Sequence, residues 1–267
     1  MLLLRTEIRR ALSRRLVRVL IALAVLGVGV IALLVFLDSE PGSPSQFRLT
    51  QLWLSQAEAT RRGVHRDAIL RLTTIPFVMM GVVGGASFIG AEYRAGTITT
   101  LLTWEPRRLR VLGAKLAAAA LVAASVYLVV QALLVAALAL VAQAGGSTAG
   151  ADAAFWTGVV ELLTRGAVLT AAVVLVSACI ATVGRNTSAA LGVCFGYVIA
   201  VEATLARLRP GWMQWFLVPN AVAFANGEPL ELPDQTISVA HGMWVLGVYL
   251  VVLLVAALVV FRRRDVT

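Results

Sequence analysis

Six long stretches without a run of charges constrain the fold of this 267-residue chain more than any other feature. A hydrocarbon core of about 30 Å is crossed by roughly 20 apolar residues in helical form. Because lipid offers no hydrogen-bond partner to an open backbone, each crossing has to be a helix. We expect membrane spans over residues 17–37, 72–91, 116–143, 166–184, 186–206 and 242–261. The sequence therefore predicts an all-α, polytopic membrane protein in which residues 1–267 form a single transmembrane domain.

Composition agrees with this class. Hydrophobic residues make up 60% of the chain and charged residues 14%, with a mean hydropathy of +0.88. A soluble globular domain carries far more charge, so that class is excluded.

The basic residues predict the orientation of the chain. Six arginines fall in residues 1–18, five basic residues in 92–115, and three more arginines in 262–264. The remaining loops, 38–71, 144–165 and 207–241, have no comparable basic excess and are expected outside. We therefore expect a multi-pass protein of the cell (plasma) membrane with both termini cytoplasmic. The net charge of +9 indicates anionic membrane lipid as a partner, and no nucleic acid, because a soluble basic face is absent.

The N-terminal residues predict an amphipathic helix in the inner interface. Leu4, Ile8, Ala11 and Leu12 recur at helical spacing, while most of the arginines fall elsewhere. The alternative is a basic flank that only sets orientation.

The segment between the second and third spans, residues 92–115, predicts a short helix of its own. Ile98, Leu101 and Leu102 stand at i, i+3 and i+4, which places them on one helical face. Thr97 can cap such a helix, and Pro106 ends it. A simple turn needs only a few residues, so a structured helix here indicates a docking element. The alternative is an interfacial helix that rests on lipid.

This part of the chain carries a resemblance to a known family. Residues 85–115, GASFIGAEYRAGTITTLLTWEPRRLRVLGAK, resemble the loop of ABC-2 type permeases, the membrane subunits of ABC exporters with an ABCG-like membrane fold. The matching positions are Glu92, Gly96, Thr97, Leu101, Leu102, Pro106, Arg108 and Lys115. The chain departs from the pattern in its long first outer loop and in Glu202, an acid inside the fifth span.

The resemblance implies a permease that moves a substrate out of the cytoplasm or the inner leaflet by alternating access. Its partners would be a separate nucleotide-binding ATPase subunit, which binds ATP and Mg, and a second permease protomer, identical or related. The segment would act as the coupling helix in a groove of that ATPase. The coupling residues would be Glu92, Arg94, Gly96, Thr97, Ile98, Leu101, Leu102, Pro106, Arg107 and Arg108. Glu92 and Arg94 would hold the helix end by ion pairs, whereas Arg107 and Arg108 could equally mark the inner interface.

The chain itself lacks the residues for ATP hydrolysis. A phosphate-binding loop needs the pattern G-x-x-x-x-G-K-[ST], but the single lysine, Lys115, stands between Ala114 and Leu116. We therefore expect no enzymatic activity and no cofactor in this chain. The two histidines and two cysteines are scattered, which gives no metal site.

Several residues within the spans are candidates for a translocation path. Aromatic, methionine and acidic side chains on the second and fifth spans could line it, although packing in the core is the ordinary role of each; they are Phe77, Met80, Phe88, Phe195, Tyr197 and Glu202. Glu202 is expected to reach outer water or to pair with Arg207. Glu161 and Arg165, at i and i+4, are expected to pair on a helix surface.

Glycines on the second and fifth spans fit either a contact between two protomers or packing within the chain. The rival function is a secondary, ion-coupled transporter without an ATPase. Such a transporter should place acids near the midplane, where only Glu202 comes close.

Overall fold

The computed structural model describes residues 2–39, 46–52, 69–97 and 107–263. Within these ranges, six helical stretches are long and apolar enough to cross a membrane, as expected of a multi-pass membrane protein. They are α2 (Arg15–Asp38), α4 (Ile69–Arg94), α6 (Arg108–Ala144), α7 (Ala153–Gly184), the stretch Thr187–Leu208, and α11 (Val239–Arg263). A further helix, α1 (Leu2–Ser13), precedes them. It occupies the expected amphipathic segment, and its place at the membrane interface stays a prediction.

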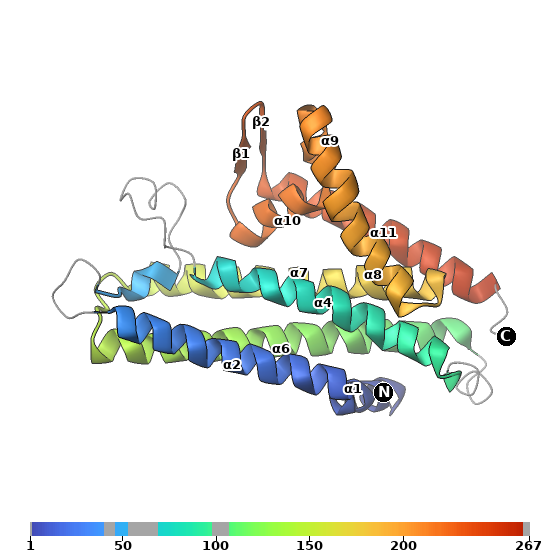
Figure 1. Ribbon diagram of the computed structural model, residues 1–267, viewed down its shortest axis with the longest axis horizontal. Helices are drawn as coiled ribbons and strands as arrows, with labels where there is room; N and C mark the ends of the chain where they lie inside the picture. The colour runs from blue at the N-terminus through green and yellow to red at the C-terminus, as the bar shows by residue number, and fades with distance from the viewer. Residues whose placement is uncertain (1, 40–45, 53–68, 98–106, 264–267) are drawn as a thin grey trace.

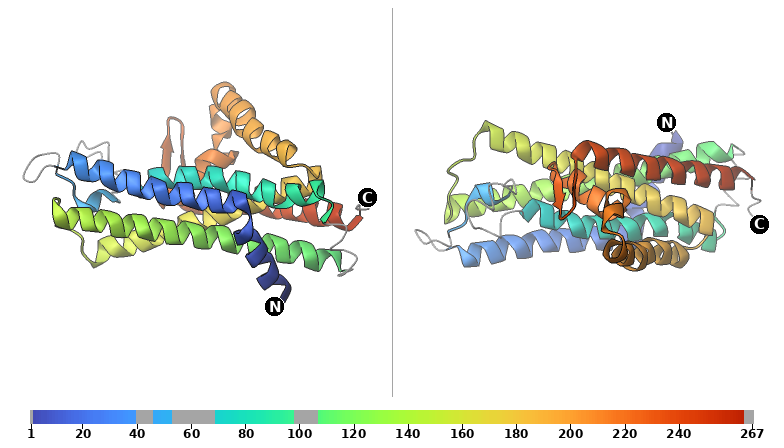
Figure 2. Two further views of the ribbon diagram at one scale, coloured as in Figure 1. Left: turned by 60° about the horizontal axis from the view of Figure 1, so that its bottom comes forward. Right: turned by 90° about the horizontal axis from the view of Figure 1, so that it is seen from above.

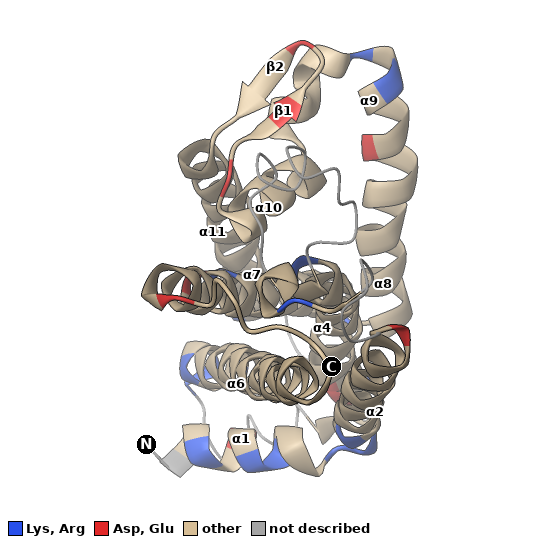
Figure 3. Cartoon of the chain, turned by 90° about the vertical axis from the view of Figure 1, so that its left-hand side faces the viewer, with Lys and Arg blue, Asp and Glu red and all other residues tan. Residues whose placement is uncertain are grey.

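Four of these helices, α2, α4, α6 and α7, run side by side as a long bundle (Figures 1 and 2). Helix α11 packs against α7, and α1 crosses the start of α6 at one end of the bundle. We call this end the α1 end; the C-terminal end of α11 also lies there (Figure 1). Basic residues mark α1, shown in blue in Figure 3.

Two helices, α6 and α7, extend by two turns or more beyond the expected spans. Helix α6 begins at Arg108 and has 37 residues, about 55 Å of helix. Helix α7 begins at Ala153, so most of the loop expected over residues 144–165 is helical. Charge had placed a boundary at Arg165, but Arg165 pairs with Glu161 one turn earlier on the surface of α7, as predicted. The charged pair therefore continues the helix instead of ending it.

The fifth helical stretch leaves the bundle at an angle (Figure 1). It consists of α8 (Thr187–Gly196), the π-helical segment η2 (Tyr197–Glu202) and α9 (Ala203–Leu208). Asn186 begins it, because its side chain accepts a hydrogen bond from the Ser188 N–H at 2.8 Å. A π-helical turn interrupts the regular hydrogen bonding, and such turns often mark functional positions.

The segment after the fifth stretch turns back towards the bundle. It forms the short 3₁₀ helix η3 (Pro210–Trp215) and then α10 (Leu217–Asn226), which packs on α11 and α7. A two-stranded antiparallel hairpin follows, with β1 (Leu230–Leu232) paired to β2 (Gln235–Ile237). This hairpin is a small addition to the all-α architecture that the sequence predicts. Near the other end of the bundle, the 3₁₀ helix η1 (Leu49–Leu52) buries both of its leucines.

Glycine allows α4 and α7 to approach closely. A Cβ at Gly85 would overlap the Ser177 hydroxyl and the Val174 carbonyl, and Gly81 lies against the same turn of α7. These two glycines therefore pack within the chain. In contrast, an added Cβ at Gly192 or Gly196 on α8 would meet no atom of another described element within 4 Å.

Candidate functional site

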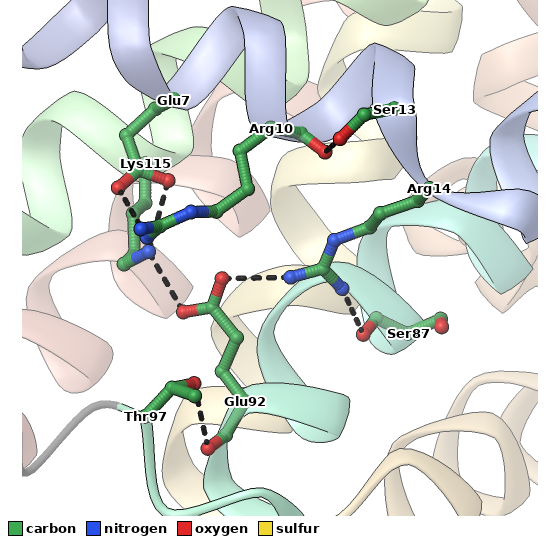
Figure 4. A network of polar contacts seen from close by, with 8 residues as sticks. All are labelled: Glu7, Arg10, Ser13, Arg14, Ser87, Glu92, Thr97 and Lys115. Atoms are coloured by element: carbon green, nitrogen blue, oxygen red, sulfur yellow. Dashed lines mark hydrogen bonds and ion pairs between the residues drawn. The ribbon is translucent and has the colours of Figure 1, made fainter.

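A row of alternating charges joins three helices at the α1 end (Figure 4). Lys115 on α6 lies at its centre. Its Nζ is 2.9 Å from Glu7 Oε2 on α1 and 2.7 Å from Glu92 Oε2 on α4. One ammonium group therefore connects two carboxylates that belong to different helices.

The central charges are almost wholly removed from solvent. The side chains of Lys115, Glu7 and Glu92 are 3%, 1% and 6% exposed. Ions that are buried in this way need partners for every charge, because losing one leaves the other uncompensated. Loss of any one of these charges would therefore destabilise the fold, which is not the case for an ion pair exposed on the surface.

Arginines complete the row at both ends. The Arg14 Nη2 is 2.7 Å from Glu92 Oε1, and its Nη1 donates to the Ser87 carbonyl at 3.2 Å. The same guanidinium lies 4.7 Å from the centre of the Phe88 ring. At the other end, Arg10 Nη1 lies 3.2 Å from Glu7 Oε1. Three cations thus face two anions, so the row carries one net positive charge.

The segment predicted to couple the chain to an ATPase begins and ends beside this row. Helix α4 ends at Arg94, and Gly96 follows in a left-handed conformation with φ of 65°. Arg94, Gly96 and Thr97 are exposed, and the Thr97 hydroxyl donates to the Glu92 carbonyl at 3.4 Å. On the far side of the segment, Arg107 immediately precedes α6.

The other predicted coupling residues are distributed differently. Arg108 is the first residue of α6, and its side chain is partly buried. Ile98, Leu101, Leu102 and Pro106 lie outside the described residues. Glu92 does make ion pairs, and its partners Arg14 and Lys115 belong to this chain.

Sequence reasoning missed Glu7. Its signal lies in the helical spacing, because Glu7 stands three residues after Leu4 and four before Ala11. It therefore belongs to the face of α1 that was expected to be apolar, away from most of the arginines. An acid on that face, with a lysine opening the third span, could have indicated a buried pair.

The residues proposed for a translocation path fall into two separate places. Phe77, Met80 and Phe88 line one apolar groove between α2, α4, α6 and α7. Phe195, Tyr197 and Glu202 lie on the fifth helical stretch and do not line this groove. The structure thus brings together three of the six.

Glu202 has a structural partner that the sequence did not indicate. Its carboxylate accepts hydrogen bonds from the backbone N–H groups of Leu217 at 2.5 Å and Val218 at 3.1 Å. These are the first two residues of α10, where a negative charge complements the helix dipole. Glu202 is buried, and among the described residues its side chain contacts α10 and the Tyr197 side chain instead of the expected partner Arg207. It therefore fastens α10 to the fifth helical stretch.

One further ion pair connects the turn after α10 to α4, and Arg165 of α7 lies close to the same turn. Arg71 of α4 lies 3.1 Å from Glu228, and an added Cβ at Gly227 would lie 2.9 Å from an Arg165 guanidinium nitrogen. Among the described residues, no group of three His, Cys, Asp or Glu side chains could hold a metal ion.

The sequence was compared with curated proteins and with models of protein families. The sequence has no significant match among curated proteins. Residues 19–267 match the family described as "Protein of unknown function (DUF2705)", which is more than half of the chain. The protein is therefore a member of the DUF2705 family.

Proposed function

We propose that this protein is the permease subunit of an ABC exporter and that it works with a separate ATPase. In this proposal the segment after α4 docks into the ATPase, whose closure on ATP and Mg moves the segment. The movement switches a substrate pathway between inward and outward access. A second permease protomer, identical or related, completes the transporter in the plasma membrane, with both termini cytoplasmic.

The buried charge row is the observation that carries this proposal. Glu92 stands at the start of the segment, and its carboxylate is bound to Arg14 at 2.7 Å and to Lys115 at 2.7 Å. A force on the segment is therefore passed to α4, to α6 and, through Glu7, to α1. The sequence of this segment supports the same role, since Ile98, Leu101 and Leu102 would share one helical face.

The first test is isolation of the tagged chain from its native membrane in mild detergent. We expect an ATPase subunit with a phosphate-binding loop to co-purify in a fixed ratio. In reconstituted vesicles, the complex should hydrolyse ATP faster than the ATPase subunit alone.

Matched substitutions locate the contact. Leu101→Asp places a charge on the apolar face of the predicted helix and should abolish stimulated ATP hydrolysis. Thr100→Asp adds the same charge to the polar face and should leave most of the stimulation. If the chain is isolated without any ATPase, and if an ionophore abolishes its transport activity, the protein is instead an ion-coupled transporter.

A further inference from the structure

The apolar groove between α2, α4, α6 and α7 has the length and the lining of a site for one hydrocarbon chain. It is partly open to the outside, and its walls are almost entirely apolar. Along α4 it runs from Phe77 to Phe88, which are eleven helical steps or about 16 Å apart along the helix. That length is roughly half of a hydrocarbon core of about 30 Å, which is the depth of one leaflet.

Helix α2 forms one border of the groove. Helix α2 has no fully buried residue and packs mainly on α6. Leu20 and Ile21 of α2 form one wall, and Met80 and Gly84 of α4 form another. An added Cβ at Gly84 would meet no atom within 4 Å, so glycine leaves this part of the groove empty. The molecule that surrounds a membrane-spanning helix is lipid.

One end of the groove is cationic. Arg14 and Ser87 lie there, beside the buried charge row. A guanidinium group has five N–H donors. The contacts of Arg14 with Glu92 and with the Ser87 carbonyl use two of them among the described residues. Since the row has one net positive charge, an anion at this end would neutralise it.

We propose that this groove binds one acyl chain of an anionic bilayer phospholipid from the leaflet at the α1 end. The lipid phosphate accepts hydrogen bonds from the remaining N–H groups of Arg14, and the chain lies along Leu20, Ile21 and Met80. In this proposal a lipid remains bound in the groove, and its binding does not require that the protein transports a substrate. Because Arg14 also holds Glu92, the lipid would reinforce the connection between α1 and α4.

The test uses the full chain in nanodiscs that contain phosphatidylglycerol with a photoreactive diazirine in its acyl chain. After illumination, peptides are mapped by mass spectrometry. We expect labelling to concentrate on residues 16–24 of α2 and 77–88 of α4. An excess of unlabelled phosphatidylglycerol should reduce this labelling at least fivefold, whereas phosphatidylcholine with the same chains should change it less than twofold.

Two variants test the site itself. Gly84→Phe fills the groove without altering a charge and should lower the labelling of these peptides at least fivefold. Gly192→Phe adds the same side chain on α8, where an added Cβ meets no atom within 4 Å, and should leave it unchanged. Labelling spread evenly over all exposed helices of the wild-type protein, or equal competition by the two lipids, would overturn the proposal. This wild-type result decides the question even if Gly84→Phe does not fold.

Discussion

Lys115 Nζ on α6 lies 2.7 Å from Glu92 Oε2 on α4, and both side chains are almost wholly buried. The two residues form a polar link between α4 and α6 near the segment that connects these helices. Because Lys115 also binds Glu7 at 2.9 Å, α1 is tied to the same point. Separation of α1, α4 and α6 at this point therefore requires breaking a buried ion pair.

Replacement of Lys115 by methionine should destabilise the protein strongly. The variant keeps the length of the side chain but leaves Glu7 and Glu92 buried near each other without their shared cation. Removing one partner of a buried pair costs about 3–5 kcal/mol. We expect a clear fall in the thermal unfolding midpoint of the detergent-solubilised protein.

The control for this variant is Arg262→Met, which removes an exposed cation from the end of α11. It should shift the midpoint little, because exposed charges contribute about 0–1 kcal/mol. Equal shifts for the two variants would mean that the buried row does not stabilise the fold.

The sequence predicts the number and class of the helices well because both follow from local composition. Six apolar stretches predict six membrane-spanning helices, and each of the six observed helices includes the central part of the corresponding expected span. The helix ends are less predictable, since a charge such as Glu161 can pair within a helix and leave it unbroken. Charge patterns therefore locate the apolar part of a helix better than its ends.

The candidate site is mostly invisible in the sequence because its contacts are long-range. Glu7 and Lys115 are separated by 108 positions, and no spacing rule connects them. Glu202 misled sequence reasoning for a similar reason. Its nearest cation along the chain is Arg207, but the chain turns back after residue 208 and brings the N–H groups of α10 to the carboxylate.

Glu202→Gln should loosen the start of α10. The carboxylate accepts two backbone N–H groups, whereas an amide offers one oxygen and turns an NH₂ group towards the other donor. Loss of a helix cap costs about 0.5–2 kcal/mol. In hydrogen–deuterium exchange, the peptide that covers residues 217–222 should exchange several-fold faster.

Glu231→Gln is the matched control for this experiment, because Glu231 is exposed on β1. It should leave exchange in the 217–222 peptide unchanged. Unchanged exchange in Glu202→Gln as well would show that α10 is held by its packing on α11 and α7 alone.

Gly227→Ala should destabilise the turn that follows α10. Gly227 has a φ of 70°, and an added Cβ would lie 2.9 Å from the guanidinium of Arg165. A left-handed conformation costs a residue other than glycine about 1–2 kcal/mol, before the crowding is counted. Gly211→Ala serves as the control, since an added Cβ there meets no atom within 4 Å. A thermal midpoint that falls equally in both variants would contradict this account.

Gly85→Ala should separate α4 from α7, the most extensively packed pair of helices in the bundle. The added methyl group would overlap the Ser177 hydroxyl and the Val174 carbonyl, and a carbonyl in a helix cannot move without disturbing the helix. Overpacking of this kind typically costs about 1–3 kcal/mol. Gly84→Ala, one position earlier, places its methyl group in the open groove and should leave the unfolding midpoint almost unchanged. The two variants differ only in the direction in which the methyl group points. A midpoint that falls in Gly85→Ala and not in Gly84→Ala therefore reports how tightly α4 packs against α7. Equal midpoints would mean that these helices approach each other less closely than the structure shows.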